Sequence, residues 1–159
     1  MREAAEKSPV AKAPGARLLM VVAPYYRAIA DQLQRGAEAA AQQGEATLDR
    51  VFVPGAFEIP AAIAHAARTN AFDGFIALGC VVRGETSHYD YVCGESARGL
   101  MDLATREGLA IGYGILTVEN IAQAQVRADP AQGDKGGEAA RACLAMLALK
   151  RRFAWTPPK

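Results

Sequence analysis

The segment between residues 82 and 88 combines the residue types that anion binding and proton transfer require. It reads Val-Arg-Gly-Glu-Thr-Ser-His and lies between an apolar run and a helical pattern. Free backbone N–H groups at a helix start bind anions, and Gly84 allows a ligand to approach the backbone closely. Thr86 adds a hydroxyl. Histidine is the residue type most often used to move protons near neutral pH, so His88 could do so beside a bound anion. These residues are equally compatible with a simpler role, in which Thr86 or Ser87 caps the helix and His88 is exposed.

Two basic residues near the end of the chain are further candidates for anion binding. Arg127 ends a helical pattern, and Lys135 lies in Gly133-Asp-Lys-Gly-Gly137, just before the last helical pattern. Glycines beside a lysine at a helix start suggest an anion site. The phosphate-loop pattern GxxxxGK[ST] is absent, and Gly112-Tyr-Gly114 lacks the third glycine of a dinucleotide fingerprint. Taken alone, each basic residue is more often a solvated surface charge.

Glu58 and three aromatic residues are candidates for binding a hydroxylated ring compound. Glu58 ends the segment Pro54-Gly-Ala-Phe-Glu58, and a carboxylate there can accept hydrogen bonds from sugar or polyol hydroxyls. Its alternative role is a favourable charge near a helix N-terminus. Tyr25, Phe57 and Tyr113 could offer flat faces to a ring ligand. Aromatic residues at strand ends more often form the edge of the core.

The cysteines and histidines form no pattern typical of a disulfide framework or a metal site. The chain has three cysteines, Cys80, Cys93 and Cys143, without CxxC spacing. This odd number favours reduced thiols in a cytoplasmic protein. The two histidines, His65 and His88, have no ligand-like neighbours at helix spacing, so we expect no metal site.

The elements that must position these residues alternate along the chain. Short continuous apolar runs separated by helical patterns predict a parallel sheet covered on both faces. The expected fold is therefore a three-layer αβα, flavodoxin-like domain with four strands, and ligands bind such sheets at the carboxyl ends of the strands. The expected strands are 17–23, 47–53, 74–81 and 110–116. The expected helices are 27–43 with Gly44 as its stop, a short one containing Pro60, about 89–106, one capped by Thr117, and 136 to about 152.

Length and composition indicate one globular domain. The chain has 159 residues, of which 51% are hydrophobic and 22% charged, and its formal net charge is +1. These values exclude a disordered chain and the basic footprint of a nucleic-acid binder. No apolar run reaches the ~18 residues of a membrane-spanning helix, and the N-terminus lacks the apolar segment of a secretory signal. We therefore expect no nucleic-acid or membrane partner. The expected organisation is a flexible arm over 1–16, a domain over 17–153 and a tail over 154–159.

Three of these segments, in this order, resemble the signature segments of lumazine synthase. They are Pro54-Gly-Ala-Phe-Glu-Ile-Pro60, Gly79-Cys-Val-Val-Arg-Gly-Glu-Thr-Ser-His-Tyr-Asp-Tyr-Val92 and Gly114-Ile-Leu-Thr-Val-Glu-Asn120. The resemblance covers about residues 17–153. It implies the condensation of 5-amino-6-(D-ribitylamino)uracil with 3,4-dihydroxy-2-butanone 4-phosphate, which yields 6,7-dimethyl-8-ribityllumazine, phosphate and water. This is the penultimate step of riboflavin biosynthesis, and the family needs no metal or organic cofactor for it.

The resemblance also implies a role for each candidate residue. His88 matches the proton-transfer histidine, and Arg127 matches the arginine that holds the butanone phosphate. Tyr113, Arg127 and Lys135 match residues that reach the site from a neighbouring subunit, so the isolated chain is expected to be inactive. The remaining matches are Glu85 and Thr86 in the loop that closes on the phosphate, Ala56, Phe57 and Glu58 on the pyrimidine substrate, Cys80, Val81 and Val82 on the uracil edge, and Tyr25 stacked on the ring. Two positions depart from the family, with Pro24-Tyr25 in place of Arg followed by Phe or Trp, and Tyr113 in place of a more usual Phe.

Assembly follows from the same resemblance, and two other functions stay open. Family members form homopentamers, some of which build capsids of twelve pentamers, and riboflavin synthase is a candidate partner.

The first alternative function is that of a flavin- or lumazine-binding protein or shell former on the same fold. The presence of His88, Arg127 and Lys135 favours catalysis instead. The second is a flavodoxin-like or receiver-type signalling module. Such modules need acidic residues where this chain has Pro24-Tyr25-Tyr26.

Overall fold

Four parallel strands form the middle layer of the protein, in the order β2–β1–β3–β4. The computed structural model describes residues 6–154. All three strand pairs are parallel, as the continuous apolar runs predicted. The strands are β1 (Arg17–Val22), β2 (Thr47–Phe52), β3 (Gly74–Val82) and β4 (Ile111–Val118).

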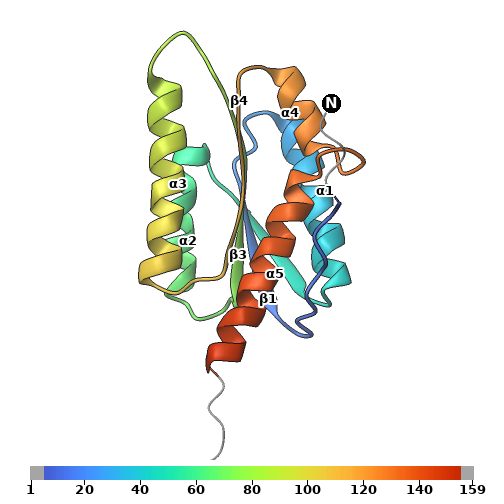
Figure 1. The fold of residues 1–159 in the computed structure, drawn as a ribbon. Coiled ribbons are helices and arrows are strands. Elements are labelled where there is room, and N and C mark those ends of the chain that lie inside the picture. Colours follow the sequence, from blue (N-terminus) through green and yellow to red (C-terminus); the bar gives the residue numbers. More distant parts are fainter. Residues whose placement is uncertain (1–5, 155–159) are drawn as a thin grey trace, which may run out of the picture.

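Helices cover both faces of the sheet, which confirms the predicted three-layer architecture (Figure 1). Alternate residues of each strand point to opposite faces. On β1, Leu18 and Met20 pack toward one set of helices, whereas Leu19 and Val21 pack toward the other. One set consists of α1 (Arg27–Gln43), α4 (Ile121–Ala128) and α5 (Lys135–Ala154), and the other of the 3-10 turn η1 (Ala56–Glu58), α2 (Ile59–Ala67) and α3 (His88–Arg106).

The fourth helix begins later than the sequence predicted. β4 continues to Val118, so Thr117 lies inside the strand, where it pairs with Val81 of β3. The N-cap of α4 is Asn120, whose side-chain oxygen accepts a hydrogen bond from the backbone N–H of Gln123 at 3.0 Å. The predicted Thr117 cap was therefore wrong, because a β-branched residue that can pair with a neighbouring strand extends the sheet.

Close backbone approaches hold α5 against the rest of the molecule. A Cβ atom on Gly112 of β4 would overlap the carbonyl oxygen of Ala139, and one on Gly136 would overlap that of Leu33 in α1. Gly44 ends α1 as predicted, but its φ of −77° is not left-handed. A Cβ atom on Gly44 would instead lie 2.6 Å from a side-chain methyl carbon of Leu144 in α5. Glycine is required for space at Gly112 and Gly136, where the neighbouring atoms belong to the backbone, whereas the flexible Leu144 side chain could move at Gly44.

The first described residues run along α1 and α5. Ala13 and Ala16 are buried in the core, and the Ala13 N–H donates to the Gly44 carbonyl at 2.8 Å. The Lys7 ammonium lies 3.2 Å from Asp134 Oδ2. The flexibility expected for 1–16 stays a prediction, and residues 1–5 and 155–159 lie outside the described residues. Within 6–154, none of the helices combines the length and the apolar character needed to cross a membrane.

A buried ion pair fixes the start of α5. Asp134 and Arg141 are 4% and 5% exposed, and Arg141 Nη1 donates to Asp134 Oδ2 at 3.1 Å. The Asp134 carbonyl also accepts from the N–H of Glu138 in the first turn of α5. Because removing one partner of such a pair leaves an uncompensated buried charge, the pair constrains the loop before α5 strongly.

We predict that Arg141→Met lowers the free energy of unfolding by about 3 kcal/mol, at the lower end of the range for a broken buried pair, because Lys7 still contacts Asp134. The matched control is Arg98→Met, an exposed arginine with two carboxylate partners, which should cost at most about 1 kcal/mol. Urea denaturation measures both. Equal losses of unfolding free energy in the two variants would show that the buried pair contributes no more to stability than an exposed one.

Candidate active site

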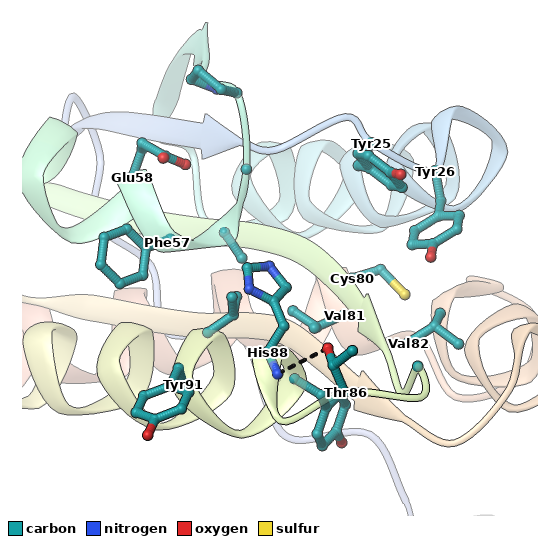
Figure 2. Close-up of a pocket in the computed structure, with 16 residues that line it drawn as sticks. Tyr25, Tyr26, Phe57, Glu58, Cys80, Val81, Val82, Thr86, His88 and Tyr91 are labelled. Carbon is teal, nitrogen blue, oxygen red and sulfur yellow. Dashed lines mark hydrogen bonds between the residues drawn. The ribbon is translucent and has the colours of Figure 1, made fainter.

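A pocket of about 680 Å³ opens beyond the carboxyl ends of β1, β2 and β3 (Figure 2). Its volume falls within the ~300–1,000 Å³ range of small-molecule sites. The chain runs from β1 to β2 on one side of β1, and then from β2 to β3 on the other side of β1, so the direction in which strands are added reverses at β1. Open parallel sheets bind ligands at such a switch point. The pocket therefore lies at the carboxyl ends of the strands, where the sequence predicted a ligand site.

The exposed backbone edge of β3 forms one wall of the pocket. The last register pair with β1 is Val22 with Leu78, whereas β3 stays paired with β4 as far as Val82. Ala23 N–H donates to the Leu78 carbonyl, on the β1 side. Because backbone groups of successive residues point to opposite edges, the N–H and C=O groups of Cys80 and Val82 point to that same side. They have no backbone partner there among residues 6–154, so they can hydrogen-bond the edge of a planar ligand.

The loop between β3 and α3 forms a second polar wall. Backbone hydrogen bonds hold both ends of the loop. The Arg83 N–H donates to the Val118 carbonyl at 2.9 Å, and the Asp90 N–H donates to the Ser87 carbonyl at 3.0 Å. Within residues 6–154, no acceptor contacts the backbone N–H groups of the residues between, 84–86. They precede a helix of 19 residues, whose dipole favours an anion at this end.

The capping interpretation of this loop has weak support. Ser87 occupies the N-cap position but makes no side-chain capping bond. Thr86 Oγ1 accepts from the His88 N–H at 3.4 Å, the dashed line in Figure 2, which is long for a hydrogen bond. The backbone N–H groups of residues 84–86, just before α3, are therefore free for a ligand.

His88, the first residue of α3, directs its imidazole into the pocket on the side of Phe57 (Figure 2). Ala56 is buried and anchors η1 to the core, while Phe57 is 55% exposed. Glu58, at the end of η1, also lines the pocket and is exposed. The pocket thus brings together an imidazole, a carboxylate and an uncovered aromatic ring.

Two tyrosines after β1 lie at the other end of the pocket. The rings of Tyr25 and Tyr26 meet edge to face, with centroids 4.9 Å apart. Tyr25 is 76% exposed, so its ring is free to contact a ligand. Burial raises the pKa of Tyr26, with smaller contributions from Tyr25 and Cys80. The Tyr26 hydroxyl therefore remains protonated at neutral pH.

Four predicted site residues lie outside the pocket of their own chain. Arg127 is exposed in the last turn of α4, and its Nη1 donates to the Gln123 carbonyl at 3.2 Å. Lys135 begins α5 and pairs with Glu138 at 2.7 Å. Both helices cover the face of the sheet opposite to α3. The other two are Tyr113, 47% exposed on β4, and Glu85 in the β3–α3 loop.

The pocket also contains residues that sequence reasoning missed. Tyr89, Tyr91 and Val92 line it from the first turns of α3. The helical pattern marked only the face containing Val92 as buried, whereas Tyr91 is 67% exposed. The available signal was their position directly after His88, since a helix that starts at a site contributes its first turn to that site. Within residues 6–154, no three metal-ligating side chains cluster together.

The thiol of Cys80 is a neutral part of the pocket wall. Burial, and secondarily the nearby Cys93, raises its pKa from 9.0 to about 11. The thiolate is the reactive form of cysteine, and a raised pKa means that this form appears only as the pH approaches 11. Cys80 is therefore suited to packing at neutral pH and not to nucleophilic attack.

We predict that iodoacetamide alkylates Cys80 slowly at pH 8, and that the rate rises about tenfold per pH unit through pH 10, since the thiolate fraction does so below the pKa. Peptide mass spectrometry measures the rate, with Cys80→Ser as the assignment control and a small model thiol as reference. A rate for Cys80 that levels off below pH 9 would contradict the raised pKa.

Comparison with known proteins identifies the family. The family model described as 6,7-dimethyl-8-ribityllumazine synthase matches residues 15–151. The chain is 58% identical over 137 residues to the 6,7-dimethyl-8-ribityllumazine synthase of Methylobacterium radiotolerans, covering 86% of this chain and 84% of that one. It is 55% identical over 138 residues to the Novosphingobium aromaticivorans enzyme of the same name, covering 87% and 99%. It is also similar to 6,7-dimethyl-8-ribityllumazine synthase 1 of Rhizobium meliloti, at 53% identity over 149 residues, covering 91% and 97%. The chain therefore belongs to the 6,7-dimethyl-8-ribityllumazine synthase family of enzymes.

Proposed function

We propose that the protein condenses 5-amino-6-(D-ribitylamino)uracil with 3,4-dihydroxy-2-butanone 4-phosphate to form 6,7-dimethyl-8-ribityllumazine, inorganic phosphate and water, the penultimate step of riboflavin biosynthesis. One observation carries this proposal. A single pocket contains both an unpaired strand edge, suited to a planar heterocycle, and an unpaired loop at a helix N-terminus, suited to a phosphate. These are the two chemical groups that the two substrates present.

The pyrimidine substrate binds along β3 in this proposal. Its uracil ring carries alternating carbonyl and N–H groups, which complement the free backbone groups of Cys80 and Val82. Phe57 and Tyr25 contact the faces of the ring, and their exposure supports this because an uncovered aromatic ring gains most from a ligand. Glu58 accepts hydrogen bonds from the ribityl hydroxyls. Ala56 and Val81 complete the apolar wall.

The phosphate binds at the loop before α3. The free N–H groups of residues 84–86 surround the anion, and the Thr86 hydroxyl adds a donor. Glu85 does not line the pocket, and its contribution in this proposal is its backbone N–H, which has no backbone acceptor within residues 6–154. Arg127 of a neighbouring subunit supplies the guanidinium that neutralises phosphate as it leaves.

His88 is the proton-transfer group between the two substrates. The amine attacks the carbonyl, and water leaves as the imine forms. Phosphate is then eliminated, and the second amine attacks the remaining carbonyl and closes the ring with loss of a second water. Each of these steps moves a proton at a nitrogen or oxygen atom. A positioned imidazole contributes typically ~10²–10⁴-fold to such steps. The remaining catalysis comes from holding two substrates together, which removes the entropic cost of their encounter.

The complete site requires a second copy of the chain. Arg127 and Lys135 lie on the far face of the sheet from His88, so one chain cannot bring all three together. Large exposed apolar side chains support burial against other subunits; they include Val51, Phe52, Met101 and Val126. We propose a cytoplasmic homopentamer in which Tyr113, Arg127 and Lys135 complete a neighbour's pocket. A twelve-pentamer capsid and a partnership with riboflavin synthase stay predictions of the family resemblance.

A turnover assay on the purified protein tests this function. The two substrates are mixed, and lumazine absorbance and released phosphate are followed above the uncatalysed background. We expect the two products in a one-to-one ratio, with rates that saturate in both substrates. Tight lumazine or riboflavin binding without any rate above background would support the binding-protein alternative and overturn the proposed catalysis.

Mixed assemblies test the shared site. His88→Ala and Arg127→Ala should each lose about 10²-fold or more in kcat, since one removes the proton relay and the other the phosphate cation. When the two variants are co-expressed, about a quarter of the sites in randomly mixed cyclic assemblies should contain both intact residues, so activity should return. The matched control is Arg127→Ala mixed with Lys135→Ala. That mixture should be no more active than its two parents, because both residues come from the same neighbouring subunit and no site regains both. A His88/Arg127 mixture no more active than its parents would contradict the shared site.

A further inference from the structure

The guanidinium of Arg83 joins three elements at the rim of the pocket. Arg83 directly follows β3, and its Nε donates to Glu119 Oε2 at 2.9 Å and to Oε1 at 3.1 Å. Glu119 directly follows β4. Arg83 Nη1 lies 3.4 Å from Oδ1 of Asp90 in the first turn of α3. The Arg83 Cζ atom lies 4.2 Å from the ring centroid of Tyr89, also in that turn, a distance typical of a cation–π contact.

These contacts of Arg83 are the main side-chain interactions that anchor the β3–α3 loop, which carries the free N–H groups. Residues 84–86 make no backbone hydrogen bonds within the described chain, and nothing lies within 4 Å of the position of a Cβ on Gly84. The loop is therefore held mainly at its ends. At the first end, the Arg83 backbone bonds to Val118 while its side chain bonds to the adjacent Glu119. The conformation of the loop depends on both attachments.

Arg83 itself is not directed at the pocket. Tyr89 and Thr86 line the pocket, whereas Arg83 does not. Its positive charge is offset by the carboxylates of Glu119 and Asp90. The side chain therefore has little net field to offer an anion in the pocket, and its geometric effect on the loop is the larger contribution.

We propose that Arg83 is a positioning residue, which with Glu119 holds the β3–α3 loop in the conformation whose backbone N–H groups bind the substrate phosphate. This inference rests on the proposed function. A misplacement of reacting or binding groups by about 1 Å can cost up to 10²-fold, so an exposed ion pair with little value for stability can have a large effect on binding.

Two substitutions of opposite charge separate positioning from direct attraction. Arg83→Met removes a positive charge and Glu119→Ala a negative one. If the pair positions the loop, both substitutions should raise KM for the butanone phosphate by roughly ten- to a hundredfold, with the KM for the ribitylaminouracil and the Tm nearly unchanged. If Arg83 instead attracted the phosphate directly, Glu119→Ala should lower that KM, since it unmasks the arginine charge.

Two further variants complete the experiment. Arg83→Lys should restore only part of the affinity, because an ammonium cannot contact Glu119 and Asp90 while also laying a planar face on the Tyr89 ring. Arg98→Met is the matched control, an exposed arginine of α3 with two carboxylate partners, Glu95 and Asp102. Its KM values should equal those of the unaltered protein. If Arg83→Met behaves like Arg98→Met, or if Glu119→Ala tightens phosphate binding, the positioning role is overturned.

Titration of the assembled protein with inorganic phosphate gives a readout that does not require turnover. Weaker phosphate binding in both Arg83→Met and Glu119→Ala supports the positioning role, even if the unaltered protein lacks turnover and the proposed reaction fails. Absence of phosphate binding by the unaltered protein overturns the positioning role. Active turnover with unchanged phosphate binding in both variants overturns the positioning role alone and leaves the proposed reaction standing.

Discussion

The difference in length between two neighbouring strands underlies the candidate site. β3 stays paired with β4 to Val82, but its pairing with β1 ends at Leu78. A strand edge without a partner strand leaves its backbone N–H and C=O groups to be satisfied by water or by a ligand. Here the open edge faces a pocket, so a ligand can supply the missing hydrogen bonds. The same extension of β3 carries its following loop to the end of β4, where Arg83 bonds to Val118 and Glu119.

The packing of α5 explains why Arg127 and Lys135 lie away from the pocket of their own chain. α5 lies so close to β4 and α1 that Gly112 and Gly136 have no room for side chains. The buried Asp134–Arg141 pair then fixes its first turn. Lys135 and the end of α4, with Arg127, are held on the face of the sheet that α3 does not cover. Rigid placement away from their own pocket leaves these basic groups available to a neighbouring subunit, which agrees with the proposed assembly.

Most elements could be predicted because their signals are local. The bounds of α1 agree with the prediction, and β1, β2 and β3 agree to within a residue. The end of β4 was predicted two residues too early, since whether Thr117 extends a strand or caps a helix depends on a partner strand distant in sequence. Tyr89 and Tyr91 were missed for a related reason. Helical periodicity identifies the buried face of α3, but it does not show which exposed residues of the first turn face a pocket.

The sequence by itself determined the class of fold, the order of its elements, the segments that contribute to the site and the family. Apolar periodicity, turn residues and sequence motifs are properties of short stretches of chain, and they can be recognised without knowledge of any long-range contact. Only the tertiary structure decided the register between β1 and β3, the free N–H groups of the β3–α3 loop, the Arg83–Glu119 contact and the position of Arg127 across the sheet. Each of these depends on which distant residues are hydrogen-bonded or packed together. The sequence of one segment does not determine how it is positioned against another segment far away in the chain.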